Sequence, residues 1–173
     1  MVSEIATERL RLMPVTPADE DALCALFWHP QVGRYLSEQV PTGGAIRQII
    51  DATTDPSSIA SFWRVATRDG TGLLGLVGVW RPSTSALALR PIGWRSLELV
   101  VAFHPDAWGK GLATEAVEPV IEHGLADGVT FAILGAVAEP NRPAHALMRR
   151  CRFAELGRVT GSAYPIVVYE RAF

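Results

Sequence analysis

The stretch from Glu98 to Ala116 constrains the fold more than any other part of this sequence. An apolar run, Leu97–Phe103, predicts a strand, which leads through the two-glycine turn Trp108-Gly-Lys-Gly111 into an alanine-rich segment. That segment predicts a helix from about Ala113 to Ala126, with Glu115 in its first turn, where a carboxylate suits the positive end of the helix dipole. Glycines let a backbone curl around a ligand, and the first N–H groups of a helix are unpaired. The stretch therefore predicts an anion-binding site, with a phosphate group as the expected ligand.

The glycine turn contains Lys110, the single lysine among 16 Lys and Arg residues. Its place in the loop indicates a functional role, although arginine-biased coding explains a lone lysine equally well. A P-loop is excluded, because the residue after Lys110 is Gly111 rather than Ser or Thr. A second glycine motif, Gly70-Thr-Gly-Leu-Leu-Gly75, matches the dinucleotide-binding fingerprint, but a β-type run, Leu76–Trp80, follows it where that fingerprint needs a helix. We interpret this motif as part of a hairpin.

Composition narrows the class of protein. A chain of 173 residues with 49% hydrophobic and 20% charged residues predicts one globular domain over residues 1–173. A net charge of −2 argues against nucleic acid as a partner. Cys24 and Cys151 have no metal-site spacing, and a chain of this size needs no disulfide. Neither a signal peptide nor a membrane-spanning run is evident, so we expect a cytoplasmic protein with no membrane partner.

Polarity patterns place the elements along the chain. The predicted strands are Thr7–Met13, Phe62–Thr67, Leu73–Trp80, Leu97–Phe103, Phe131–Val137, and one or two more between Arg158 and Arg171. The predicted helices begin at Thr16-Pro17 (ending at Trp28), near Ala45 (to Ala52), near Ala113 (to Ala126), and after Asn141 (to about Arg150). Residues 81–94 are expected to form a loop, and Pro119 is an interior helix proline that removes one hydrogen bond. The pattern is that of a mixed α/β sandwich.

Three motifs in this order resemble one family. They are Thr7-Glu-Arg-Leu-Arg-Leu12 with Pro30-Gln-Val-Gly-Arg-Tyr-Leu36, the loop Trp108-Gly-Lys-Gly-Leu-Ala113, and Asn141 with Phe153 twelve positions later. The chain resembles the GNAT superfamily of acetyl-CoA-dependent N-acetyltransferases, and more narrowly the RimJ/RimL branch that acetylates ribosomal-protein N-termini. The resemblance implies a GNAT-like α/β (α+β) fold, whose mixed central sheet has about six or seven strands flanked by about four helices.

The chain departs from the family pattern at three positions. Trp108 stands where the acetyl-CoA loop usually begins with Gln or Arg, a variation that the branch tolerates. Ala144 stands at the usual Ser of the closing motif, and Met148 stands where several GNAT enzymes have a Tyr general acid. The usual donors for protonating the leaving thiolate are therefore absent, and His145, one turn after Asn141, is an alternative donor.

The resemblance implies direct transfer of acetyl from acetyl-CoA to a primary amine in a ternary complex. The amine belongs to a protein N-terminus or to a small molecule, no metal takes part, and a homodimer is left open. Asn141 is expected to contact the amide or thioester region of the donor, to cap a helix, or both. The expected donor-binding residues are Val101 and Phe103, whose backbone aligns the pantetheine arm, and the loop residues Trp108, Gly109, Lys110, Gly111, Leu112 and Ala113.

Glu98 is the candidate catalytic base. It is the charged residue of the apolar run Leu97–Phe103, at a position where related enzymes often have a glutamate. An alkylammonium is not a nucleophile, so the acceptor must lose a proton, and burial in a strand raises a carboxyl pKa toward the useful range. The alternative is a structural salt bridge, for example with Arg95.

Substrate choice is expected to lie in two loops and the C-terminal tail: His29 to Gly44, Arg81 to Trp94, and the residues near Tyr164. The aromatic residues that wall an acceptor pocket or belong to the core are Trp28, Tyr35, Trp80 and Trp94. Four arginines around the last helix meet donor phosphates or form a solvated face: Arg142, Arg149, Arg150 and Arg152. The missing acid residues favour a second hypothesis, a non-catalytic acyl-CoA-binding sensor or interaction domain.

Overall fold

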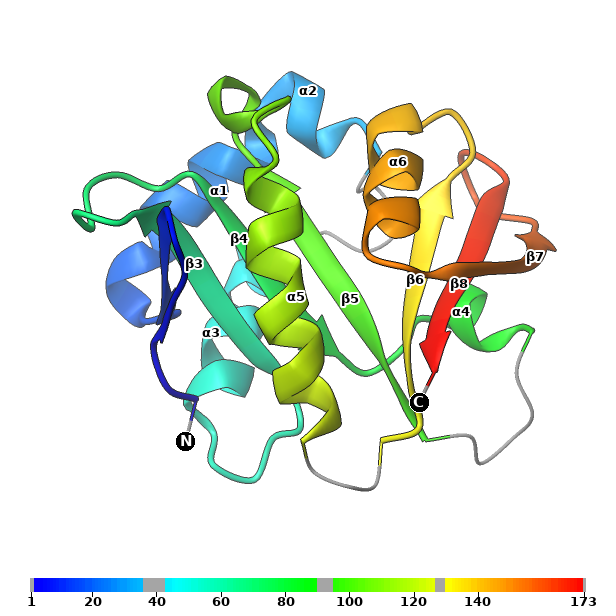
Figure 1. The fold of residues 1–173 in the computed structure, drawn as a ribbon, viewed down its shortest axis with the longest axis horizontal. Helices are drawn as coiled ribbons and strands as arrows, with labels where there is room; N and C mark the ends of the chain where they lie inside the picture. The colour runs from blue at the N-terminus through cyan, green and yellow to red at the C-terminus, as the bar shows by residue number, and fades with distance from the viewer. Residues whose placement is uncertain (1, 36–42, 90–94, 127–129, 173) are drawn as a thin grey trace.

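The computed structural model describes residues 2–35, 43–89, 95–126 and 130–172. Its strands form one eight-stranded sheet in the order β1-β2-β3-β4-β5-β6-β8-β7 (Figure 1). The strands are β1 (Ile5–Ala6), β2 (Leu10–Pro14), β3 (Ser61–Thr67), β4 (Gly75–Trp80), β5 (Ser96–Phe103), β6 (Ala132–Ala138), β7 (Ala154–Val159) and β8 (Ile166–Ala172). The helices are α1 (Glu20–Trp28), α2 (Pro30–Gly33), α3 (Gly43–Thr54), α4 (Thr84–Leu87), α5 (Leu112–Leu125) and α6 (Arg142–Arg150), with 3-10 turns at Pro17–Asp19 and Pro105–Ala107.

The sequence placed most of these elements, with some differences in their bounds and two short helices, α2 and α4, that it did not predict. The strand predicted over Thr7–Met13 begins only at Leu10, as β2, because the chain turns over residues 7–9, where the N–H of Thr7 donates to the carbonyl of Leu10; the two-residue strand β1 precedes this turn. The predicted loop over residues 81–94 contains the single-turn helix α4, which the Ser83 hydroxyl caps by accepting the N–H of Ala86. As predicted, helix α5 contains Pro119 in its interior, and it continues to Leu125. In the described part of the chain, no helix has the length and apolarity that crossing a bilayer requires.

Two helical layers cover the two faces of the sheet. Figure 1 shows α5 and α6 on the face toward the viewer, and their buried side chains, such as Ile121 and Met148, pack with strand residues such as Trp63 and Val79. Helices α1 and α3 cover the other face, where Leu23 belongs to a second apolar cluster. Burying both faces is what allows the central strands to be largely apolar.

The glycine motif between β3 and β4 is a hairpin, as predicted. The two strands pair antiparallel, and Gly70 and Gly72 take the positive φ angles of 80° and 68° that the turn requires. Hydrogen bonds from Thr67 and Thr71 stabilise the Asp69 carboxylate and lower its pKa to about 2. No helix follows these glycines, which excludes a dinucleotide-binding loop.

Strands β5 and β6 form the parallel pair of the sheet, and they separate early. Their register joins Ser96–Glu98 to Ala132–Leu134, while β5 continues to Phe103 and β6 to Ala138 without further pairing between them. The backbone groups between the diverging ends are available to another partner. The candidate site lies in this opening between β5 and β6.

Gly78, in the middle of β4, tests how tightly the sheet packs. A Cβ there would collide with the ring of Phe62 and lie 2.5 Å from the carbonyl oxygen of Ser61. We therefore expect Gly78→Ala to lower the free energy of unfolding by about 1–3 kcal/mol, as overpacking does. Gly44→Ala is the matched control, because no atom lies within 4 Å of its Cβ. Denaturant unfolding measures both, and equal stability of the two variants would contradict the packing argument.

Candidate active site

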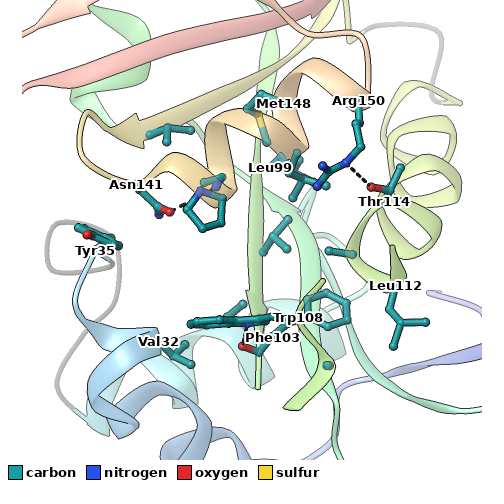
Figure 2. Close-up of a pocket in the computed structure, with 18 of the residues that line it drawn as sticks. Val32, Tyr35, Leu99, Phe103, Trp108, Leu112, Thr114, Asn141, Met148 and Arg150 are labelled. Carbon is teal, nitrogen blue, oxygen red and sulfur yellow. Dashed lines mark hydrogen bonds between the residues drawn. The ribbon is translucent and has the colours of Figure 1, made fainter. Parts of the chain in front are cut away.

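A cavity of about 1140 Å³ opens where β5 and β6 separate (Figure 2). Several parts of the chain line it: the diverging ends of the two strands, the Trp108–Gly111 loop, the first turn of α5, one side of α6, α2 with the two residues after it, and Arg9. The predicted donor-binding residues on its wall are Val101, Phe103, Trp108, Gly109, Gly111, Leu112, Ala113 and Asn141. Residues distant in sequence thus surround one space.

The backbone of β5 presents unpaired groups to this cavity. The N–H of His104 donates to the carbonyl of Leu74 at 2.8 Å, which extends the ladder between β4 and β5 by one step. Because backbone groups alternate in direction along a strand, those of Val101 and Phe103 face away from β4 and toward β6. The indole N–H of Trp108 donates to the carbonyl of Phe103 at 2.7 Å, which holds the indole at the end of this edge.

The loop before α5 has the geometry of an anion site. Gly109 and Gly111 adopt φ angles of 71° and 75°, a left-handed region that favours glycine. Gly111 is the N-cap of α5, and its carbonyl accepts the N–H of Glu115 at 3.2 Å, the first bond of the helix. The N–H groups of the residues between them, Leu112 among them, precede this bond and have no acceptor within the helix. They lie at the cavity wall, at the positive end of the helix dipole.

The side chain of Lys110 is directed elsewhere. Its ammonium donates to the carbonyl of Asp106 at 2.7 Å, and Lys110 is not among the described residues that line the cavity. The carbonyl of Lys110 accepts a hydrogen bond from Arg9 at 2.9 Å. Lys110 therefore stabilises the shape of its own loop, and what it offers a ligand is its backbone.

A polar contact that sequence reasoning missed fixes the start of α5. The Glu115 carboxylate accepts the backbone N–H of Arg9 at 2.8 Å, the guanidinium of Arg9 at 2.7 Å and the hydroxyl of Thr7. Burial of Glu115 opposes its ionisation, but the hydrogen bonds from Thr7 and Arg9 outweigh it and hold the Glu115 pKa below its ordinary value. Thr7 and Arg9 lie more than a hundred positions from Glu115, so no local sequence pattern could predict this contact.

This contact makes stability depend on pH. Because the folded-state pKa of Glu115 lies below its ordinary value of 4.5, the carboxylate stabilises the fold fully above that pH and loses its effect as the pH falls through the lowered pKa. We expect Glu115→Gln to lower the free energy of unfolding at pH 7, and the difference from the wild type to shrink between pH 5 and about pH 3. Urea unfolding across this range measures it. A difference that does not change with pH would contradict the assignment.

Helix α6 brings one arginine and several small or apolar groups to the cavity. Of the four arginines named from the sequence, Arg150 lines the wall, with its guanidinium donating to the Thr114 hydroxyl at 3.3 Å beside the first turn of α5 (Figure 2). Asn141 caps the helix, its side-chain oxygen accepting the N–H of Ala144 at 3.3 Å, which leaves its NH₂ group to donate. Ala144 and Met148, the two positions at which the sequence departs from the expected Ser and Tyr donors, both line the cavity.

His145 forms hydrogen bonds with residues away from the cavity. Its Nε2 donates to the carbonyl of Glu139 at 3.0 Å, because a carbonyl can only accept, so its Nδ1 accepts the Tyr169 hydroxyl at 2.8 Å. His145 does not appear among the described lining residues of the cavity. Both of its nitrogens are occupied, which weakens its candidacy as a proton donor.

Glu98 is buried at the point where β5 and β6 part. Its side chain is 3% exposed, and its carboxylate accepts the N–H of Ser83 at 2.6 Å. Alternation along β5 places it on the same face as Ala102, opposite the face covered by α5. Ala102 lines the cavity, but Glu98 is not among the described lining residues.

The cavity wall also includes a short helix that the sequence did not predict. Helix α2 carries Val32, and it is followed by Arg34 and Tyr35; all three line the cavity. Tyr35 was among the four predicted aromatic residues. Trp28 is 68% exposed on α1, and Trp80 packs against Phe62 in the core. Trp94 and the parts of the two predicted specificity loops at 36–42 and 90–94 lie outside the described residues.

The fold and the cavity together define an acyltransferase architecture. The model of the family described as "Acetyltransferase (GNAT) domain" matches residues 9–154, and the chain belongs to this family, whose members transfer an acyl group from coenzyme A. The GNAT resemblance and the GNAT fold expected from the sequence are thereby confirmed. Within the described residues, the sheet has eight strands rather than six or seven, because β1 is a separate strand of two residues and both β7 and β8 are formed.

Solved structures of acetyltransferases have the same fold. Ribosomal-protein-S5-alanine acetyltransferase from Vibrio fischeri is 12% identical, with 98% of this chain and 96% of that chain covered and a TM-score of 0.74. The RimL ribosomal L7/L12 α-N-protein acetyltransferase is 14% identical, with 100% and 96% covered and a TM-score of 0.74. Spermidine N-acetyltransferase from Vibrio cholerae, in complex with CoA and spermine, is 18% identical, with 96% of each chain covered and a TM-score of 0.74. These identities support a shared fold alone. No curated protein sequence matches the chain.

Proposed function

We propose that this protein is an acetyl-CoA-dependent N-acetyltransferase that transfers acetyl to a primary amine by direct attack in a ternary complex. The observation that carries the proposal is the opening between β5 and β6, which leads to a left-handed glycine loop at the N-terminus of α5. A long, thin ligand with an anionic end fits such a site, since strand-edge groups can pair with its amides and helix N–H groups with its phosphates. The single sheet, from β1 to β8, supports one acetyltransferase domain over the whole chain.

The donor would be held by three groups of residues. The N–H groups of Gly109–Ala113 would bind the pyrophosphate, with Arg150 adding a positive charge beside the same helical turn. The backbone of Val101 and the N–H of Phe103 would pair with the pantetheine amides, and the Phe103 carbonyl is already bound to Trp108. The NH₂ group of Asn141 would donate to a carbonyl of the donor.

The reaction forms a C–N bond and breaks the C–S bond of the thioester. The neutral amine attacks the acetyl carbonyl carbon, the oxyanion that develops is stabilised by a backbone N–H of β5, and coenzyme A leaves as the thiolate. The proton lost by the amine is taken by a base. We propose Glu98 for this role, acting through an intervening water because its carboxylate lies behind the cavity wall.

Neither Ala144 nor Met148, which occupy the positions of the missing thiolate donors on the described cavity wall, can donate a proton. A thiol has an ordinary pKa of about 8.5, so a thiolate departs from a tetrahedral intermediate far more readily than an amide or alkoxide would. The leaving sulfur can therefore take its proton from water after departure. The reaction then balances as amine plus thioester giving amide plus thiol.

The alternative is a non-catalytic acyl-CoA-binding sensor. The apolar side chains at Ala144 and Met148, together with the position of Glu98 behind the wall, favour it. Release of free thiol from acetyl-CoA across a panel of amines and peptides separates the two functions. We expect turnover with at least one acceptor class; calorimetric binding of acetyl-CoA with no thiol release across the panel would favour the sensor.

A further inference from the structure

The cavity reaches both faces of the sheet, and this divides it into two sides. Val101 and Val137 belong to the face covered by α5 and α6, where the glycine loop and the first turn of α5 lie. Ala102 and Ala136 belong to the opposite face, and they line the same cavity. Helix α2 closes the cavity on that opposite side, with Val32 packed into the apolar cluster there. If the donor occupies the first side, the second is left for the acceptor.

Positively charged residues outnumber negatively charged ones on the described cavity wall. Among the described lining residues, the charged ones are Arg9, Arg34, Glu115 and Arg150. Arg9 and Glu115 neutralise each other in an ion pair of 2.7 Å, and Arg150 lies beside the first turn of α5. Arg34 is therefore the charged residue of the described wall that lies on the proposed acceptor side.

Arg34 is positioned by aromatic contacts. Its guanidinium lies 5.3 Å from the centre of the Tyr35 ring, and this ring packs edge-on against Tyr164 at 5.8 Å. Within the described part of the chain, Arg34 makes no ion pair. A guanidinium offers two parallel donors, which match a carboxylate.

The wall also constrains the amine. Apart from the neutralised Glu115, no carboxylate or histidine is found among the described lining residues, so nothing there attracts a polycation or takes a proton directly. At pH 7.5 about one third of a peptide α-amine is neutral, against about 0.1% of a lysine-type amine, because their ordinary pKa values are about 7.8 and 10.4. The nearby arginines further disfavour an ammonium ion. An α-amine is the acceptor that needs least help from a base.

We propose that the acceptor is the α-amino group of a peptide that carries a carboxylate side chain within its first few residues, and that Arg34 binds this carboxylate. This inference rests on the N-acetyltransferase function proposed above. Arg34 is thus a specificity residue, which acts on the acceptor rather than on the donor.

Thiol release with a peptide panel tests the acceptor class. The peptides share their length and first residue and carry Asp, Asn or Lys at position 2, 3 or 4, and spermidine and an N-terminally blocked lysine peptide complete the panel. We expect kcat/KM for the best Asp peptide to exceed that for its Asn counterpart by about tenfold, in line with a charged hydrogen bond. The blocked lysine peptide should be slower by about a hundredfold. A preference for Lys peptides or spermidine would overturn the proposal.

Charge reversal tests the residue. Arg34→Glu should abolish or invert the preference for Asp over Lys peptides while leaving KM for acetyl-CoA unchanged. Arg47→Glu is the control: Arg47 is an exposed residue of α3, pairs with Glu20 at 3.2 Å and is not on the described wall. It should leave the preference intact. A raised KM for acetyl-CoA in Arg34→Glu, with the peptide preference unchanged, would overturn the assignment and place Arg34 in the donor site.

The two proposals fail in different ways. Turnover of several amines with no dependence on peptide charge would refute the acceptor class and leave the acetyltransferase function standing. Binding of acetyl-CoA without turnover of any acceptor would refute both.

Discussion

Glu98→Gln is expected to lower kcat at neutral pH by tenfold or more. A general base contributes roughly 10²- to 10⁴-fold, and an amide cannot accept the proton. The fold should persist, because the glutamine carbonyl can still accept the N–H of Ser83 in place of the carboxylate oxygen that lies 2.6 Å away. Thiol release measures the rate, and thermal unfolding checks that the variant remains folded.

The pH profile separates catalysis by Glu98 from a purely structural role. If Glu98 takes the proton, the acidic limb of the kcat profile belongs to its carboxyl group and disappears in Glu98→Gln. A structural carboxylate would change Tm or KM and leave the shape of the profile as it was. An unchanged pH–rate profile would therefore remove Glu98 from the mechanism and leave deprotonation to water.

The geometry of the proposed donor side could be predicted because its signals are local. Strand, glycine turn and helix start follow one another within Glu98–Ala116, and each rests on a short-range rule: apolar run, positive φ, and helix N-terminus. The structure places these residues around one cavity. The role of Asn141 as a helix cap was equally local, since its side chain accepts the N–H three residues later.

The proposed acceptor side and the long-range contacts of the site could not be predicted in the same way. Helix α2 has a single turn, Pro30–Gly33, too short for any periodic pattern. The contact of Arg9 with Glu115 joins residues 106 positions apart, and the sequence around either residue gives no indication that the two meet. Alternation along β5 shows that Glu98 and Leu99 face opposite sides, but the sequence does not say on which side a cavity opens. That depends on where β6 leaves β5.

Gly111→Ala is expected to weaken acetyl-CoA binding by about tenfold. Gly111 caps α5 with φ at 75°, and an alanine in the left-handed region costs roughly 1–2 kcal/mol. Steric exclusion is not the cause, since a Cβ there would meet its nearest neighbour, the Arg9 guanidinium, at an ordinary 3.6 Å. The chain relieves the strain by rotating the peptide groups that carry the anion-binding N–H groups, so the loss appears in affinity.

Gly111→Asn provides the matched control, because asparagine enters the left-handed region more readily than alanine. We expect calorimetry with acetyl-CoA to rank the affinities as glycine, then asparagine, then alanine. That order would tie donor binding to the backbone conformation of the loop and not to the volume of the side chain. If asparagine, the larger residue, were the more harmful of the two, crowding would be the cause and the loop would not bind the donor through its N–H groups. If both variants bound acetyl-CoA with wild-type affinity, the anionic end of the donor would have to bind somewhere other than the N-terminus of α5.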